Sequence, residues 1–403
     1  MRDTWGYRLH LVIKRRITGT LRLALSLRVR QRRGRGAPRP VTGTPVTGTV
    51  VLLDRCLGLG DALMISPALR LLAPLGPVTV VTALPPLLNW SGEWRVCASW
   101  AEMTDAVNRL TAAGRLLLVP RLGLAGLLVL IRWPGRLPAG VIRLGPTTWL
   151  DTATGTRGEI TGRHYTDGAL ACAQALVNQA TGLQSDVPAE PTVPRLAPRL
   201  PPDGGDAVVA AQALPDNRPL VALAPWATSR IRRWPLDHWS HLINRLAITD
   251  PHPVFLLLGS ADERPAGDEI VRNLNPAASV VNLMGRLSLA ETTAMVARAA
   301  LLVACDNGIL HLGLGVGTPV VAIFGSTDPA ARLTGHRWRL AADPSLCPHR
   351  RAPCYPDLHR DPSCPTAAEC LSGLAPETVA GLALELLASH RLSTPETPEE
   401  TRP

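Results

Sequence analysis

The chain has 403 residues, of which 46% are hydrophobic and 18% charged, and its formal net charge is +10 at pH 7. This composition excludes an intrinsically disordered protein, and the length allows two ordinary domains, each with its own core. The excess charge lies in the first 40 residues, which hold twelve basic residues and one acidic residue, so the nearly neutral remainder does not indicate a nucleic-acid-binding protein.

Residues 1–48 form a basic extension in which arginines are interspersed with aliphatic residues. On a helix, the aliphatic residues would gather on one side and arginines on another, which is typical of a helix on an anionic membrane surface. Residues 21–29 also alternate with the period of two that indicates a strand. Two interpretations remain open: a membrane-surface segment within residues 1–40, or an unstructured arm or misassigned start ahead of a domain that begins near Thr49.

A first domain is predicted over residues 49–184, where apolar runs typical of buried strands alternate with helix-like segments. This succession of strand, helix and strand indicates a parallel sheet with crossover helices. Strands are expected at 50–54, 78–84 and 115–120, and helices at 62–75, 105–113 and 165–181.

The turn after the first predicted strand contains Gly58, Gly60 and Asp61, and a helix follows it. A dinucleotide fingerprint needs a third glycine at the position that Leu63 occupies, so a dinucleotide site is disfavoured here. Taken alone, Asp61 fits a helix cap better than a catalytic carboxylate.

A proline-rich linker is predicted over residues 185–217, followed by a second domain over 218–391 and a disordered tail over 392–403. The second domain repeats the alternation of apolar strands and helices. Two α/β domains joined by one linker would enclose a cleft, which is a usual place for a small-molecule site.

The loop that follows the first strand of the second domain contains Thr228, Ser229 and Arg232. Hydroxyls and a guanidinium suit phosphate oxygens, although a solvated basic loop is an equally good interpretation. Further along, Glu263 follows another strand and glycine, where a carboxylate could accept two sugar hydroxyls; this signal is weak.

The stretch CDNGILHLGLGVGTPVVAIFGSTDP carries the strongest signal, because two strand-to-glycine turns in it hold polar side chains. If a helix begins near Gly308, its positive end and its first N–H groups would attract a diphosphate. A capped helix with a surface histidine would explain part of the pattern but not the clustering of both turns. The candidate ligand-binding residues here are Asp306, Asn307, Gly308, His311, Thr327 and Asp328.

Taken together, GLGDALMISPAL, PWATSRIRRWP, NLMGRLSLAE and the stretch above resemble glycosyltransferase family 9, the ADP-heptose:lipopolysaccharide heptosyltransferases, from about Val50 to Leu371. The resemblance implies an α/β fold of the GT-B architecture, with two facing Rossmann-like domains and a cleft between them. It also implies inversion at the anomeric carbon, no required cofactor or metal, and a nucleoside-diphosphate sugar as donor, with ADP-linked heptose favoured.

Position by position, the resemblance makes Asp61 the general base, which overturns the helix-cap interpretation, and places Gly58 and Gly60 in the acceptor-side loop. Arg232 falls where the family usually has a phosphate-binding lysine, and Asn307 replaces a threonine. The donor-binding set implied or proposed is Thr228, Ser229, Arg232, Glu263, Asp306, Asn307, Gly308, His311, Thr327 and Asp328.

Eight cysteines are present, and the first four stand alone in apolar segments, as buried reduced thiols of a cytoplasmic protein would. The other four, in segment 347–370, lack the tight pair typical of a zinc site. Free thiols with local disulfides and a metal clip remain equally open for them. These four are Cys347, Cys354, Cys364 and Cys370.

The predicted function is therefore transfer of a sugar to a hydroxyl of a glycolipid or cell-envelope glycan, at the cytoplasmic side of the plasma membrane and without nucleic acid. No stretch is apolar for long enough to predict a membrane span, and no signal peptide is expected. Two alternatives remain: a GT-B-type nucleotide-sugar epimerase, and a non-catalytic nucleotide-sugar-binding protein.

Overall fold

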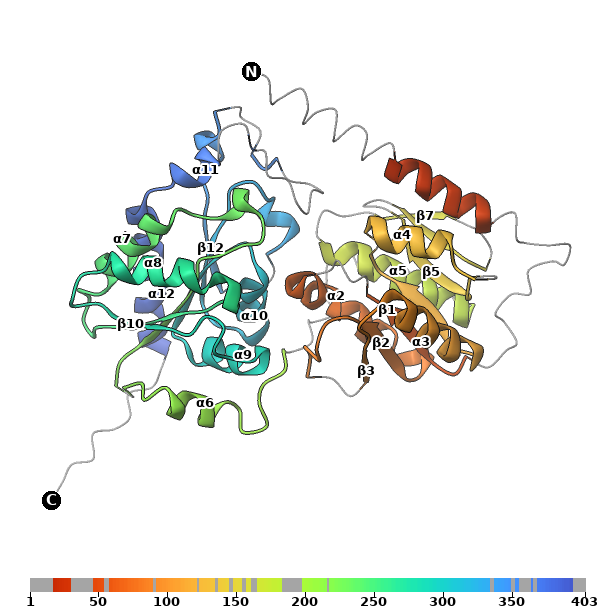
Figure 1. The fold of residues 1–403 in the computed structure, drawn as a ribbon, viewed down its shortest axis with the longest axis horizontal. Helices are drawn as coiled ribbons and strands as arrows, with labels where there is room; N and C mark the ends of the chain where they lie inside the picture. Colours follow the sequence, from red (N-terminus) through yellow and green to blue (C-terminus); the bar gives the residue numbers. More distant parts are fainter. Residues whose placement is uncertain are drawn as a thin grey trace, which may run out of the picture. The chain divides into compact units, whose positions relative to one another are not determined.

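The computed structural model describes residues 17–29, 46–53, 58–89, 92–121, 123–134, 137–144, 148–153, 157–160, 165–182, 198–215, 217–333, 337–348, 352–354, 364 and 368–393. The chain divides into two compact units, with the first division in sequence between Ala197 and Pro198 (Figure 1). Within the described ranges, no helix is long and apolar enough to cross a membrane.

The first unit is built on a seven-stranded sheet in the order β3-β2-β1-β4-β5-β6-β7. The strands from β3 to β5 run parallel, while β6 and β7 add an antiparallel edge. The bounds are β1 Thr49–Leu52, β2 Val78–Thr82, β3 Glu93–Val96, β4 Leu116–Val119, β5 Gly140–Arg143, β6 Thr148–Asp151 and β7 Arg157–Glu159.

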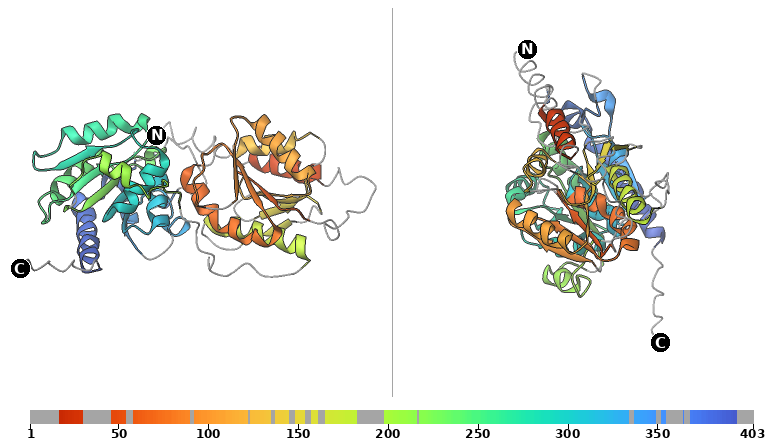
Figure 2. Two further views of the ribbon diagram at one scale, coloured as in Figure 1. Left: turned by 90° about the horizontal axis from the view of Figure 1, so that it is seen from below. Right: turned by 90° about the vertical axis from the view of Figure 1, so that its right-hand side faces the viewer.

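Helices cover both faces of this sheet, because β1 and β4 are buried along their whole length and need apolar neighbours on each side. On one face α2 packs against α5 (Figure 2). On the other, α3, α4 and a helix over residues 17–29 share one core cluster with the strands. The bounds are α2 Leu59–Leu71, α3 Trp100–Ala112, α4 Leu124–Ile131 and α5 Tyr165–Thr181.

Residues 17–29 are helical, which decides against the strand interpretation of 21–29. Leu25 and Val29 on this helix are buried in the same cluster as α3 and α4. The first unit therefore begins upstream of Thr49, and the expectation that the folded domain starts there is corrected. The rest of the basic extension, residues 1–16 and 30–45, lies outside the described residues.

The second unit has a six-stranded, fully parallel sheet in the order β10-β9-β8-β11-β12-β13. Alternate residues of β8 enter the two core clusters on opposite faces: Val221 and Leu223 pack on one side, Ala222 and Ala224 on the other. The bounds are β8 Leu220–Ala224, β9 Val254–Leu257, β10 Ser279–Asn282, β11 Leu301–Cys305, β12 Val320–Ile323 and β13 Trp338–Ala341.

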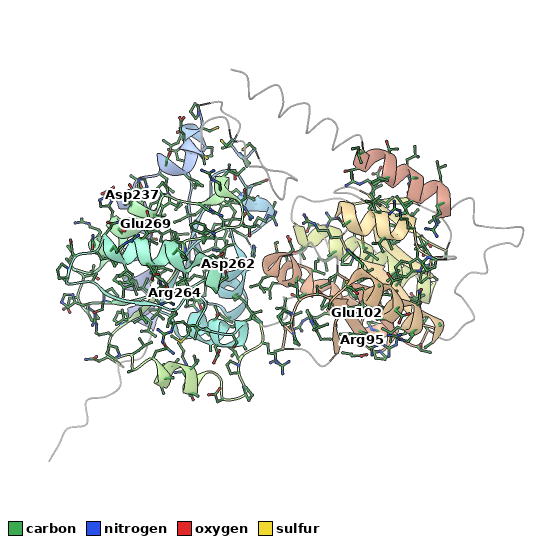
Figure 3. The ribbon with its side chains drawn as sticks, in the orientation of Figure 1. Arg95, Glu102, Asp237, Asp262, Arg264 and Glu269 are labelled. Carbon is green, nitrogen blue, oxygen red and sulfur yellow. The ribbon has the colours of Figure 1, made fainter. Side chains whose placement is uncertain are left out.

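Helices α7, α8 and α12 contribute to one cluster of the second unit, and α6, α9 and α10 to the other. Helix α8 is amphipathic: it buries Ala266 and Ile270 and leaves Glu269, which Figure 3 labels, exposed. The bounds are α6 Asp206–Ala211, α7 Leu236–Leu246, α8 Arg264–Arg272, α9 Leu289–Arg298, α10 Gly308–Val316, α11 Glu369–Ser372 and α12 Pro376–Ser393.

The predicted α/β class with two Rossmann-like units is confirmed. In each unit the strand order reverses between the first and fourth strands, β1 and β4 or β8 and β11, and ligands of such sheets bind outside the carboxyl ends of strands at this point. The predicted linker 185–217 includes residues that belong to the second unit, because α6, within that range, packs against α9. The tail beyond Ser393 lies outside the described residues.

Candidate functional site

In the first unit, Asp61 lies in the first turn of α2, just beyond the carboxyl end of β1. Its Oδ2 accepts a hydrogen bond from the backbone N–H of Gly58 at 3.2 Å, and its Oδ1 lies 3.4 Å from Nη1 of Arg121. Arg121 follows β4, the strand beside β1, so both residues lie at the switch point of the sheet. Asp61 thus does close the helix start, as the helix-cap interpretation expected, while also carrying a charge paired with an arginine.

In the second unit, the start of α10 is fixed by the side chain of Asn307. Its Oδ1 accepts from the N–H of Leu310 at 2.9 Å, and its Nδ2 donates to the carbonyls of Ala224 at 3.0 Å and Trp226 at 2.7 Å. The amide therefore ties the loop after β8 to the helix after β11. This is a structural role, and the assignment of Asn307 to the donor-binding set stays a prediction.

A buried charged cluster stands beside this helix start. Asp306 and His311 are each 2% exposed, and their Oδ1 and Nε2 atoms lie 3.9 Å apart. Arg232 donates from Nη1 to the backbone carbonyl of Asp306 at 3.0 Å and to its Oδ2 at 3.2 Å. A buried carboxylate needs such partners, so Arg232 both neutralises Asp306 and is held at the start of α10.

A second set of contacts, made by Arg233, holds the loop after β8. Arg233 stacks on the ring of Trp226, with its guanidinium carbon 3.7 Å from the ring centre, and donates to the carbonyl of Ala227 at 2.6 Å. It also donates to the carbonyl of Thr228, whose side chain is exposed. Arg233 thus shapes the loop, while the phosphate contact predicted for Thr228 and Arg232 stays a prediction.

Two hydroxyls of the predicted donor set are buried and lack a hydrogen-bond partner among the described residues: those of Ser229 and Thr327. Their neighbour Ser326 donates to the carbonyl of Ile231 at 3.0 Å, which joins the turn after β12 to the loop after β8. An unpaired buried hydroxyl costs free energy, so both would gain from a ligand that supplies acceptor oxygens.

The described residues of the second unit therefore bring together the loops after β8, β11 and β12, as predicted, with Gly308 at the start of α10 and Asp328 after Thr327. The Oε2 of Glu263 accepts from the N–H of Ser260 at 2.8 Å and closes the short helical turn after β9, and its assignment to the donor stays a prediction.

Residues 170–359 match the family model of glycosyltransferase family 9 (heptosyltransferase). The predicted resemblance to glycosyltransferase family 9 is confirmed. The family 9 match includes every predicted donor-binding residue but begins after Asp61, whose assignment as general base stays a prediction.

Two curated relatives carry the same family name. The lipooligosaccharide heptosyltransferase 2 of Haemophilus influenzae is 34% identical over 120 residues, which are 29% of this chain and 34% of the relative. The lipopolysaccharide heptosyltransferase 2 of Salmonella typhimurium is 31% identical over 141 residues, which are 34% of this chain and 40% of the relative. The chain thus aligns with between 34% and 40% of the length of these relatives.

Solved structures extend the likeness of the fold over most of the chain. A family 9 glycosyltransferase from Veillonella parvula has a TM-score of 0.62 at 16% identity, covering 86% of this chain and 99% of that one. ADP-heptose lps heptosyltransferase II of E. coli has a TM-score of 0.58 at 17% identity, covering 85% and 99%. The fold class is therefore that of the GT-B heptosyltransferases.

The four late cysteines lie beside the second unit's loops. Cys347 and Cys370 are buried, Cys354 is exposed, and Cys364 packs against Ile231 and Ala368. Burial raises the pKa of the Cys370 thiol to about 11, and the three other cysteines of the segment add to the effect. Among the residues described, no group of three or more His, Cys, Asp or Glu side chains is placed to hold a metal ion.

The bacterial glycosyltransferase TibC from enterotoxigenic E. coli, an iron-containing dodecamer, also has a similar fold, with a TM-score of 0.55 at 14% identity over 86% of this chain and 80% of that one.

The early cysteines Cys97, Cys172 and Cys305 are buried and free, as predicted, while Cys56 lies outside the described residues. Burial raises the pKa of both Cys172 and Cys305 to about 12, so neither is a nucleophile at neutral pH.

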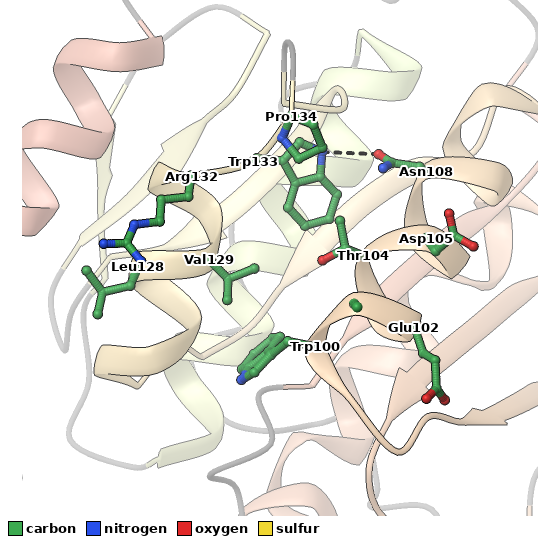
Figure 4. Close-up of a pocket in the computed structure, with 11 residues that line it drawn as sticks. Trp100, Glu102, Thr104, Asp105, Asn108, Leu128, Val129, Arg132, Trp133 and Pro134 are labelled. Carbon is green, nitrogen blue, oxygen red and sulfur yellow. Dashed lines mark hydrogen bonds between the residues drawn. The ribbon is translucent and has the colours of Figure 1, made fainter.

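A groove of about 690 Å³ lies elsewhere, between α3 and α4 of the first unit (Figure 4). Its lining includes Trp100, Leu128, Val129 and Trp133, and contains none of the predicted site residues. Sequence analysis missed this groove and also missed Arg121. The signal for Arg121 was a basic residue directly after the buried strand β4, just as Asp61 follows the buried strand β1.

Proposed function

We propose that this protein transfers a sugar, heptose or a related one, from an ADP-linked donor to a hydroxyl of a glycolipid or cell-envelope glycan. The observation that carries the proposal is the set of three loops at the switch point of the second sheet, with Arg232 at the start of α10 and two unpartnered buried hydroxyls nearby. The family 9 match and the name of the E. coli structural neighbour, ADP-heptose lps heptosyltransferase II, support the choice of sugar and nucleotide.

In the proposed reaction, an acceptor oxygen forms a bond to the anomeric carbon as the bond from that carbon to the diphosphate breaks. Asp61 accepts the proton of the acceptor hydroxyl, which requires hydrogen-bond reach of ~2.6 to 3.2 Å. Attack from the side opposite the leaving diphosphate inverts the anomeric centre. Arg121, whose Nη1 lies 3.4 Å from Oδ1 of Asp61, would help to hold this carboxylate in place.

The leaving diphosphate gains negative charge as the bond breaks, and the second unit offers positive groups to receive it. Arg232 and the first backbone N–H groups of α10 would stabilise that charge, with the hydroxyls of Ser229 and Thr327 as further donors. We propose that these groups are sufficient without a bound metal ion, and transfer that is unchanged by a chelator would support this. Loss of transfer in the chelator, restored by added iron, would instead assign this chain a metal requirement.

We further propose that the acceptor is reached at the cytoplasmic face of the membrane, where the basic residues 1–40 would be attracted to anionic lipids. A glycolipid acceptor carries its own membrane anchor, so an enzyme that works on it gains from binding the same surface.

The test is thermal unfolding of the full chain with ADP, GDP, UDP, CDP and dTDP at equal concentration. A ligand at a hundredfold its dissociation constant adds about 2.7 kcal/mol, which raises the midpoint by several degrees. The proposal expects ADP to stabilise the wild type but not Arg232→Ala, when each protein is compared with its own unliganded midpoint. His241→Ala, at an exposed histidine of α7, is the control that should keep the shift. No shift with any nucleotide would reject the donor site, and ADP-heptose consumed without an acceptor would indicate an epimerase.

A further inference from the structure

The helix over residues 17–29 has apolar side chains on two sides. On one side, Leu25 is fully buried and Val29 is 8% exposed, both in the core of the first unit. On the other, Ile17, Leu23 and Leu27 are 46%, 54% and 44% exposed. Leu23 and Leu27 are one helical turn apart, so they form a stripe rather than scattered contacts.

The orientation of this helix is fixed by Arg28. Its Nη1 donates to the carbonyl of Leu130 at 2.8 Å, and the guanidinium also reaches the carbonyls of Ile131 and Trp133. The carbonyls of Leu130 and Ile131 belong to the last turn of α4, where helix carbonyls need donors, and Trp133 follows two residues after the helix. The helix therefore keeps Leu25 inward and cannot turn its outer stripe into the core.

The neighbouring helix α4 also has exposed apolar side chains. Its eight residues carry no polar side chain, although Leu128, Val129 and Ile131 are all partly exposed. Leu128 and Val129 line the groove shown in Figure 4, with Arg132 beside it. An outer layer made of such helices is unusual for a surface that faces only water.

The charge of the flanking sequence decides which occupant suits this stripe. Residues 1–40 hold twelve basic residues against one acid, so the segment that contains the helix attracts a negative surface. Exposed Leu and Ile within a basic segment fit the boundary between lipid headgroups and acyl chains. A second copy of this chain would bring the same positive charge and would repel it.

We propose that Ile17, Leu23 and Leu27 form a docking surface for an anionic lipid bilayer, carried rigidly by the first unit through Arg28. This inference rests on the proposed function, in which the acceptor is membrane-bound. It assigns lipid binding to a helix packed on the first unit rather than to an arm that is separate from the fold. The first unit, which carries Asp61, would then be held against the lipid surface.

The test is co-sedimentation of the full chain with vesicles of phosphatidylcholine containing phosphatidylglycerol, compared with phosphatidylcholine alone. The triple variant Ile17→Ser, Leu23→Ser, Leu27→Ser should bind the anionic vesicles at least about tenfold more weakly, because three large apolar side chains no longer enter the lipid. Ile248→Ser, at an apolar side chain that is 65% exposed in the second unit, is the matched control and should bind like the wild type. The single variant Leu23→Glu probes the same stripe if the triple variant lowers the unfolding midpoint.

Equal vesicle binding by wild type and by Leu23→Glu would overturn the proposal, as would absence of binding by the wild type. A dimer that becomes a monomer in the triple variant, with vesicle binding unchanged, would assign the stripe to a second copy and also overturn it. Vesicle binding and the ADP-induced shift in unfolding are independent measurements. If ADP has no effect but the stripe variants lose vesicle binding, the surface stands and the transferase proposal fails.

Discussion

Helices α2 and α10 begin with the same kind of side-chain cap, but the capping residues differ in chemistry. Each helix follows a buried strand and a polar turn, and in each a side-chain oxygen accepts a backbone N–H near the helix start. In α2 that oxygen belongs to a carboxylate, Asp61, whose other oxygen lies 3.4 Å from Nη1 of Arg121. In α10 it belongs to the neutral amide of Asn307, and the acid of that turn, Asp306, is paired with Arg232 instead.

The difference indicates that the two helix starts have different roles. A carboxylate at a helix start suits proton transfer, whereas a neutral cap leaves the positive end of α10 available to an anion. Four sets of substitutions would break or sharpen this comparison.

The largest effect is expected for Asp61→Asn, which keeps an oxygen to accept from Gly58 but removes the base. Sugar transfer from ADP-heptose should fall by about 10² to 10⁴, the usual contribution of general base catalysis. The free energy of unfolding in urea and the ADP-induced shift in melting temperature should change little, because ADP is assigned to the second unit. Transfer at the wild-type rate would remove Asp61 from the mechanism.

Arg232→Ala should destabilise the second unit by about 3 kcal/mol, since it leaves the buried carboxylate of Asp306 without its guanidinium partner. Urea unfolding measures this, and Arg230→Ala, at an exposed arginine of the same loop, is the control with a change within about 0.5 kcal/mol. Adding Asp306→Asn to Arg232→Ala should recover part of the loss. If Arg232→Ala is as stable as Arg230→Ala, the pair contributes nothing to the fold.

Asn307→Ala removes the cap of α10 and both ties to the loop after β8, and should cost about 1 to 2 kcal/mol of unfolding free energy. The matching substitution in the other unit, Gly58→Ala, removes no side-chain bond and should cost less, about 0.5 kcal/mol, because alanine is a poorer N-cap than glycine. Equal costs would show that the two helix starts are not held differently. Asn307→Asp, which keeps the capping oxygen but loses both donors, separates the two contributions.

The smallest effect on stability is expected for Ser229→Ala and Thr327→Val. Because neither hydroxyl has a partner among the residues described, their removal should change the unfolding free energy by no more than about 0.5 kcal/mol. The ADP-induced shift should nevertheless shrink, since these are the hydroxyls assigned to the diphosphate. A stability loss with an unchanged shift would reverse the assignment and make them structural.

Much of the fold was predictable because strands buried on both faces are continuous apolar runs. Helix α5 has the bounds that the sequence predicted, 165–181. The sequence did not predict β3, whose Glu93 and Arg95 give an edge strand the composition of a loop. Nor did it predict β13, another edge strand, because edges need no apolar run on both faces.

By itself, the sequence determined the alternation of strands and helices, the polar residues at the start of α2 and α10, and the concentration of positive charge in the first 40 residues. These are local properties, set by periodicity, turn chemistry and composition. Only the tertiary structure decided that Arg121 pairs with Asp61, that Arg232 pairs with Asp306, and which side of helix 17–29 is buried. Each of these depends on strand order or helix packing, which brings together residues that are far apart in the chain and whose pairing no local pattern specifies.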